Sequence, residues 1–295
     1  MFAVLVPVGP GQQEVDRLRD TLDSLRAFED SDEVNLLLVD DNDVPRDLAS
    51  AAGDWASCEV LRTPLWRDGT PDPYSAMVAG TIEGMRAAAR REPEFLLKLD
   101  TDALIIGPVA DKLRAALSED GVGLVGSYTH TCSGARRDWT EWETKLRRAG
   151  RPIVPGLGHT LRFRSLRDAG TVRRLIRSAA GHGYEWGANC LGGAYAAGPQ
   201  LLNRRDLLHW QPWVGTWVSE DVVVGLLASA GGLSMRGSVD PGDAFAIAWR
   251  YLPYPPERLI DQGYSVIHSV RDQAYGDERE LRAYFRSRRH AAPSQ

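Results

Sequence analysis

Two carboxylates separated by one residue follow an apolar run in the first half of the chain. The run Phe95–Leu99 leads directly into Asp100 and Asp102, and residues two apart on a strand point to the same side. Two like charges aimed at one place repel each other and need a counter-charge. A divalent cation that prefers oxygen ligands, Mg2+ or Mn2+, would supply it. The pattern therefore predicts a site for a metal ion and a diphosphate.

A second pair of carboxylates, Glu220 and Asp221, opens a run that is apolar on nearly every side. Such a run predicts a buried helix over 221–230. In one interpretation, Ser219 or Asp221 caps the helix, whose dipole favours acids at this end. In the other, Asp221 is a general base that takes a proton from an acceptor hydroxyl. The two interpretations are compatible, and the segment alone favours neither.

Three further features could belong to the same site. His268 ends a short apolar run; a lone His there is most often structural, but beside two Asp it becomes a candidate third ligand that favours Mn2+ over Mg2+. Gly192 and Gly193 form a tight turn or allow the backbone to approach a bound sugar. Tryptophans near the candidate base could stack on an acceptor sugar, although Trp is more often a core residue. They are Trp186, Trp210, Trp213 and Trp217.

The elements that must position these residues are those of an α/β fold. The first 126 residues alternate apolar runs with helical spacing, which predicts βαβ units and a mostly parallel sheet flanked by helices. Ligands of such sheets bind beyond the carboxyl ends of the strands, where Pro7 and Asp41 also fall. Asp41 could accept a hydrogen bond from a nucleotide base or a ribose, although the acidic cluster 40–43 by itself is more typical of a polar turn.

The expected strands cover 2–8, 34–39, 59–62, 95–99, 122–127 and 266–268. The expected helices cover 15–25, 74–90, 171–180, 200–209, 221–230 and 277–289. Between 128 and 183 the pattern weakens and is broken, for example over 155–158, and the last residues, 290–295, are expected to be disordered.

Composition narrows the class of protein. The 295 residues are 43% hydrophobic and 25% charged, as in an ordinary globular protein. We expect a single domain with a nucleotide-binding half (1–126), an acceptor and catalytic half (127–270) and a C-terminal helix and tail (271–295). The net charge of −5 gives no reason to expect nucleic acid or a membrane as partner. The three cysteines form neither a disulfide framework nor a zinc pattern. No apolar run is long enough to span a membrane, so we expect a cytoplasmic protein.

Taken in order, these segments resemble the GT-A glycosyltransferases, and within them the fringe and β-1,3-galactosyltransferase family. The matching segments are Asp72-Pro-Tyr74, Lys98-Leu-Asp-Thr-Asp102, Gly192-Gly-Ala-Tyr195, Glu220-Asp-Val-Val-Val-Gly225 and His268. The element Val39-Asp-Asp-Asn42 is similar to one shared more broadly by inverting GT-A enzymes. Two departures are clear. The metal motif is Asp-Thr-Asp rather than three Asp, and residues 128–186 match no part of the family.

The resemblance implies a GT-A (Rossmann-like) fold and a metal-dependent, inverting glycosyltransferase that uses a UDP-sugar. Asp102 and His268 would hold Mn2+ (or Mg2+), Asp100 would support the metal or the ribose, and Asp221 would be the base. The implied nucleotide-sugar positions are Pro7, Asp41, Asp100, Thr101, Gly192, Gly193 and Glu220. The acceptor could be a small molecule, a peptide or a saccharide. A retaining transferase, a sugar nucleotidyltransferase and a non-enzymatic nucleotide-sugar sensor remain open as alternatives. The lack of a Gly-rich, Lys- or Arg-bearing loop after the first strand counts against the nucleotidyltransferase.

Overall fold

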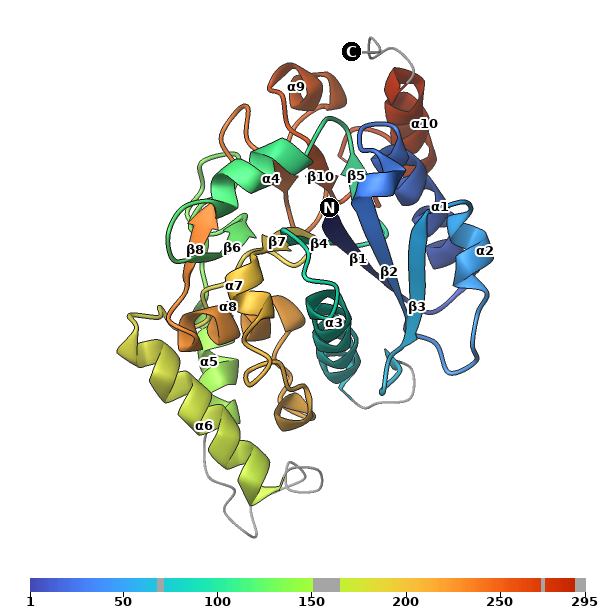
Figure 1. Ribbon diagram of the computed structural model, residues 1–295. Helices are drawn as coiled ribbons and strands as arrows, with labels where there is room; N and C mark the ends of the chain where they lie inside the picture. The colour runs from blue at the N-terminus through green and yellow to red at the C-terminus, as the bar shows by residue number, and fades with distance from the viewer. Residues whose placement is uncertain (68–71, 151–164, 272–273, 290–295) are drawn as a thin grey trace.

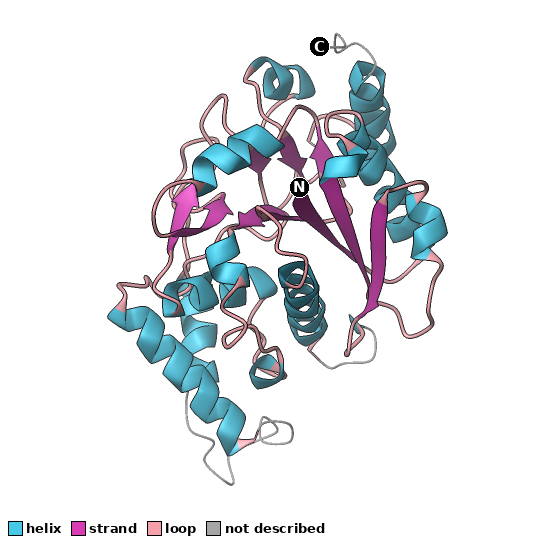
Figure 2. Ribbon diagram, viewed as in Figure 1, coloured by secondary structure: helices cyan, strands magenta, loops and turns pink. Residues whose placement is uncertain are grey.

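The computed structural model describes residues 1–67, 72–150, 165–271 and 274–289 (Figure 1). The breaks expected over 155–158 and the tail 290–295 lie outside these residues. A seven-stranded sheet runs through the centre of the molecule, with helices on both faces (Figure 2). Its strands are β1 (Phe2–Val8), β2 (Val34–Asp40), β3 (Ser57–Arg62), β4 (Leu96–Leu99), β6 (Val122–Gly126), β7 (Ala194–Ala197) and β8 (Ser234–Gly237).

The order of the strands is β3-β2-β1-β4-β7-β6-β8. The pairs β3-β2, β2-β1, β1-β4 and β6-β8 are parallel, whereas β7 is antiparallel to both of its neighbours. The predicted α/β class with a mostly parallel sheet is therefore confirmed. Because β1, β2 and β4 are parallel and adjacent, their carboxyl ends meet at one edge of the sheet, where ligands bind in folds of this kind.

The helices cover the sheet because the strand residues alternate between its faces. On β1, Val4 and Val6 belong to the apolar core shared with α1, α2 and α4, whereas Ala3 and Leu5 belong to the core shared with α3, α7 and α8. The α-helices are α1 (Gln12–Arg26), α2 (Leu48–Ala52), α3 (Pro73–Ala89), α4 (Ala110–Leu117), α5 (Thr140–Ala149), α6 (Leu166–Gly181), α7 (Pro199–Leu202), α8 (Glu220–Ala230), α9 (Pro256–Asp261) and α10 (Glu278–Arg289). Short 3-10 helices within the described residues include η1 (Ser31–Glu33) and η4 (Gln211–Trp213).

A second, three-stranded sheet joins the C-terminal part of the chain to the central sheet. Its order is β5 (Leu104–Ile105), β10 (Val266–His268) and β9 (Phe245–Ile247). β5 begins two residues after Asp102 and runs antiparallel to β10, with Leu104 opposite Ile267. This register brings the end of β10, and with it His268, back to the end of β4.

Several elements differ from the expectations. The helix predicted over 200–209 is wrong: α7 ends at Leu202, and the chain continues in turns. Arg204 binds Asp206 at 2.9 Å and the carbonyl oxygen of Gly231 at 3.1 Å, contacts that a continued helix would not make. In the weakly patterned region the structure adds α5, and α6 begins five residues earlier than predicted. Within the part of the chain that the structure describes, no helix is both long and apolar enough to cross a bilayer.

Candidate active site at the carboxyl ends of the strands

Three potential metal ligands converge just beyond β4. One ligand atom from each of Asp100, Asp102 and His268 lies within 4.8 Å of the other two. His268 Nε2 lies 3.2 Å from Asp102 Oδ1 and 4.0 Å from Asp100 Oδ2. The backbone fixes this arrangement, since Asp100 N donates to the carbonyl oxygen of Gly193 (2.9 Å) and Val270 N donates to that of Asp102 (3.0 Å).

The imidazole of His268 is oriented as in a metal ligand. Its Nδ1 lies 2.7 Å from the carbonyl oxygen of Ala248, which can only accept, so Nδ1 carries the hydrogen and Nε2 faces the carboxylates. Burial by itself lowers the pKa of His268, but the carboxylates of Asp102 and Asp100 outweigh it and raise that pKa. Two carboxylates and an imidazole nitrogen form a donor set that suits Mn2+ better than Mg2+.

The second oxygen of Asp102 is held by its own partners. Ser269 Oγ donates to Asp102 Oδ2 at 2.6 Å, and Arg271 Nε lies 3.6 Å from the same oxygen. Burial favours the protonated carboxyl, but His268, Ser269 and Arg271 together keep the pKa of Asp102 well below its ordinary value. Asp102 is therefore an anion at neutral pH. The Arg271 side chain is 53% exposed, so a cation stands at the rim of the cluster.

A buried lysine connects the three candidate ligands Asp100, Asp102 and His268 to α8. Lys98 Nζ lies 2.6 Å from Asp100 Oδ1 and 3.1 Å from Glu220 Oε1, and it also donates to the carbonyl oxygen of Gly192. Burial raises the pKa of Glu220 against the opposing effect of Lys98, to about 7. Lys98 thus lies on the same side of the strand as Asp100 and bridges it to the acidic end of α8.

The N-terminus of α8 holds Asp221 in a fixed orientation. Asp221 Oδ1 accepts hydrogen bonds from the Ser219 hydroxyl and from Val222 N, the latter at 2.9 Å. Glu220 accepts a hydrogen bond from Asp221 N. Both carboxylates therefore accept from free N–H groups of the first turn, whereas Ser219, the N-cap residue, makes no capping hydrogen bond with its side chain. Asp221 Oδ2 faces Gly192, the neighbour of Gly193, which packs against His268.

Gly192 and Gly193 leave room for the side chains of Glu220 and His268 because they have no side chains of their own. A Cβ on Gly193 would lie 2.4 Å from atoms of the His268 ring, and a Cβ on Gly192 would lie 3.3 Å from the carboxylate oxygens of Glu220. Only a residue without a side chain lets β7 start this close to the imidazole. This role complements the sugar-side role predicted for the pair, which stays a prediction.

The nucleotide-side residues follow the neighbouring strands. Pro7 lies opposite Val39 near the ends of β1 and β2. Asp41 directly follows β2 and is buried. Its two oxygens accept from Arg67 N (2.7 Å) and Arg67 Nε (3.1 Å). The sheet thus places Asp41 and the candidate ligands Asp100 and Asp102 at one edge, as predicted. Their roles toward a nucleotide stay predictions.

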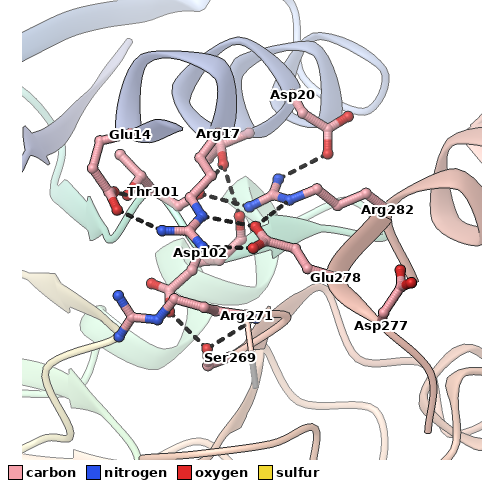
Figure 3. Close-up of polar contacts among 12 residues, drawn as sticks. Glu14, Arg17, Asp20, Thr101, Asp102, Ser269, Arg271, Asp277, Glu278 and Arg282 are labelled. Carbon is pink, nitrogen blue, oxygen red and sulfur yellow. Dashed lines mark hydrogen bonds and ion pairs between the residues drawn. The ribbon is translucent and has the colours of Figure 1, made fainter. Parts of the chain in front are cut away.

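Thr101, between the two Asp, belongs to a closed ring of polar contacts (Figure 3). Its hydroxyl donates to Glu14 of α1, and Glu14 Oε1 lies 2.5 Å from Arg17 Nη1. Arg17 Nη2 lies 2.6 Å from Glu278 Oε2 of α10, and Glu278 Oε1 accepts from Arg282 Nε at 2.9 Å. Arg282 Nη2 closes the ring on the Thr101 carbonyl oxygen at 3.0 Å. The ring places the Thr101 side chain toward α1.

An open cavity of about 560 Å3 is lined by Thr140 and Glu143 of α5, by residues 136–139 before that helix, and by Glu185 and Trp186. Arg137, one of its lining residues, donates to the carbonyl and side-chain oxygens of Asn189 (2.5 and 2.6 Å). Burial lowers the pKa of Arg137, and the negative charge of Asp221 opposes that shift without overcoming it. Of the four tryptophans singled out, Trp186 lines this cavity, whereas Trp213 is a core residue.

Sequence reasoning did not single out Ser269, Arg271, Arg282 or Arg137. Ser269 and Arg271 lie one and three residues after His268, so their position near a candidate ligand was the only available signal. Arg282 and Arg137 carry no local signal, because each acts on a segment that is distant in the sequence.

Comparison with known proteins gives distant structural similarity. No family model matches the sequence, and no curated protein matches it. The mannosyltransferase PcManGT from Pyrobaculum calidifontis, in complex with GDP-Man and Mn2+, has a TM-score of 0.41 and 17% identity over 99% of this chain and 70% of its own. TarS 1-349 from S. aureus, in complex with UDP-GlcNAc, has a TM-score of 0.35 and 16% identity over 70% of this chain and 47% of its own. The similarity extends to the course of the chain only, and the resemblance to the fringe family stays a prediction.

Proposed function

We propose that this protein is a metal-dependent glycosyltransferase that moves a sugar from a nucleotide-sugar to an acceptor hydroxyl. The observation that carries the proposal is the convergence of Asp100, Asp102 and His268 within 4.8 Å at the carboxyl ends of the strands. These residues would hold Mn2+, or Mg2+ less favourably. A divalent cation there would neutralise the charge of a diphosphate leaving group.

The donor would lie along the same edge of the sheet. Asp41 and Pro7, at the ends of β2 and β1, would contact the base and ribose of a UDP-sugar. The diphosphate would then lie next to β4, at the metal ion held by Asp100, Asp102 and His268. Asp100 and Thr101 would then flank the diphosphate. Gly192, Gly193 and Glu220, which pack against the cluster, would lie on the side of the donor sugar.

Asp221 would be the general base of an inverting reaction. Its Oδ1 is held by two donors, so the carboxylate has one orientation, and its Oδ2 faces Gly192 beside the cluster. An acceptor hydroxyl placed at Oδ2 would lose its proton as it attacks the anomeric carbon from the face opposite the diphosphate. Lys98 would keep the carboxylates of Asp100 and Glu220 in fixed positions during the reaction, since it contacts both of them.

The chain would form one domain with two functional parts, followed by a C-terminal helix and tail. Residues 1–126 would bind the nucleotide, residues 127–270 would supply the base and the acceptor site, and residues 271–295 would form the C-terminal helix and tail. The cavity lined by Trp186 and Arg137 would receive the acceptor. We expect neither a nucleic acid nor a membrane as partner, and we expect the protein in the cytoplasm.

Calorimetry with UDP and with GDP, each with and without Mn2+, tests the donor site. We expect binding of UDP that requires Mn2+ and that Asp102→Ala abolishes. The control variant Asp111→Ala removes an exposed carboxylate of α4 and should bind as the wild type does. Metal-independent binding, or no binding of either nucleotide, would contradict the proposed site.

A panel of UDP-sugars then separates the reaction types. Release of UDP with an inverted anomeric configuration in the product supports the proposal, whereas a retained configuration would show a retaining transferase. Release of pyrophosphate from a nucleoside triphosphate and a sugar phosphate would show a nucleotidyltransferase instead.

A further inference from the structure

A second cavity, of about 320 Å3, opens between α5 and α6 and is lined by three arginines, Arg147, Arg173 and Arg177. The buried side chains of Leu146 and Ile176 also line it. The cavity therefore combines an apolar wall with guanidinium groups from two helices. The described residues that line it include no carboxylate.

The positive charge around this cavity is only partly compensated. Arg147 Nη2 lies 2.7 Å from Glu143 Oε1, and its guanidinium lies 4.4 Å from the centre of the Trp186 ring. Arg173 and Arg177 are one helical turn apart, so their like charges repel across one face of α6. No ion pair joins either of them to a carboxylate of the described chain, and Arg173 Nε donates a 3.4 Å hydrogen bond to the carbonyl oxygen of Ala169. A bound anion would remove this repulsion.

We propose that this cavity, the α5–α6 arginine site, binds a phosphate-type anion carried by the acceptor. Arginine is suited to this ligand because its planar fork donates two parallel hydrogen bonds to a phosphate. Three guanidinium groups gathered on a protein whose net charge is −5 mark a local site for an anion rather than a generally basic surface.

The position of the arginine site supports its assignment to the acceptor. Trp186 lines both this cavity and the larger one beside it. The larger cavity is also lined by Arg137, which donates to Asn189, and Asn189 packs against Gly225 of α8, the helix that begins with Glu220 and Asp221. An acceptor could therefore place its anion among the arginines and its hydroxyl toward the base. The assignment to the acceptor rests on the proposed function, whereas the binding of an anion does not.

Pyrophosphate, titrated by calorimetry in EDTA so that no metal contributes, is the probe for the site. We expect the double variant Arg173→Ala/Arg177→Ala to bind pyrophosphate about tenfold more weakly or worse, because each lost charge-assisted contact lowers affinity. Arg174→Ala is the matched control: Arg174 lies on the same helix, carries the same charge and hydrogen-bonds Thr171 outside the cavity. This control should bind like the wild type.

Two further measurements complete the test. Helix content from circular dichroism should stay unchanged in the double variant, because alanine favours helix and neither replaced side chain is fully buried. Binding of UDP with Mn2+ should also stay unchanged, so a failed donor site and a failed arginine site give different results. The proposal is overturned if the wild type binds no pyrophosphate, or if Arg174→Ala weakens binding as much as the double variant does. Binding to phosphatidylglycerol vesicles without binding of pyrophosphate would assign the arginines to a membrane surface and overturn it equally.

Discussion

Arg282, in the last helix of the chain, donates a hydrogen bond from Nη2 to the carbonyl oxygen of Thr101, 3.0 Å away. Thr101 stands between the two candidate metal ligands Asp100 and Asp102. The C-terminal helix α10 therefore contacts the segment that carries the candidate metal ligands, although 181 positions separate the two residues in the sequence. The same guanidinium lies 2.8 Å from Asp20 of α1, so one side chain fixes three elements together.

Replacing Arg282 with Met should destabilise the protein by about 3–5 kcal/mol, because it leaves the buried carboxylate of Asp20 with fewer partners. It should also weaken Mn2+ binding, since the carbonyl oxygen of Thr101, between Asp100 and Asp102, loses its hydrogen bond from Arg282. Arg286→Met is the matched control: Arg286 also contacts Asp20, but its side chain is 58% exposed and, within the described residues, lacks the hydrogen bond to Thr101 that Arg282 makes. We expect a loss of at most about 1 kcal/mol there. Urea unfolding and Mn2+ calorimetry measure the two effects, and equal Mn2+ affinities in the two variants would show that Arg282 acts on stability alone.

Replacing Gly193 with Ala should abolish Mn2+ binding. The added methyl group would lie 2.4 Å from atoms of the His268 ring, so the imidazole must move away from the carboxylates. In Gly192→Ala the nearest atoms are 3.3 Å away, and a smaller loss is expected. Both variants should keep the overall fold, which circular dichroism can check. Unchanged Mn2+ affinity in Gly193→Ala would mean that His268 is not a ligand.

Replacing Asp221 with Asn should leave binding of UDP and Mn2+ intact and lower the rate of transfer by about 10²–10⁴-fold. Asn keeps an oxygen that can accept from the Ser219 hydroxyl and from Val222 N, so the N-terminus of α8 should be preserved. The amide cannot take a proton from the acceptor. Single-turnover rates with saturating donor provide the measurement, and a near-normal rate would move the base to another residue.

Stability should depend on pH through Asp20. Burial favours the protonated carboxyl, but Arg282, Arg289 and Arg286 overcome it and lower the pKa of Asp20 below its usual 3.8. A lowered pKa means that the ionised group adds stability above pH 3.8, and that this stability is lost as the pH falls through the lower pKa of the folded state. The variant Asp20→Asn should therefore be less stable by about 3–5 kcal/mol at pH 7. The difference should shrink toward pH 3, as unfolding curves at several pH values would show; a constant difference would exclude Asp20 as its source.

Much of the fold could be predicted because its signals are local. Apolar runs at strand length and helical spacing identified β1, β2, β4, α3 and α8 to within one residue at each end, and α1 to within three residues. The helix predicted over 200–209 was wrong because Arg204 lies in a turn, where it contacts Asp206 and the carbonyl oxygen of Gly231. Gly231 is distant in the sequence, so no local pattern indicates this contact. In α5, acidic and basic side chains outnumber the apolar ones, so its periodicity is weak.

The sequence by itself determined which groups could do chemistry: two Asp at the end of an apolar strand, and two carboxylates at the start of a buried helix. These patterns need only the geometry of one strand or one helix. Tertiary structure decided how the groups meet. The antiparallel pairing of β5 with β10 brings His268 to Asp102, and Lys98 joins Asp100 to Glu220. Such contacts depend on how the chain closes over more than a hundred residues, and no periodicity within one element records the partner that it will find.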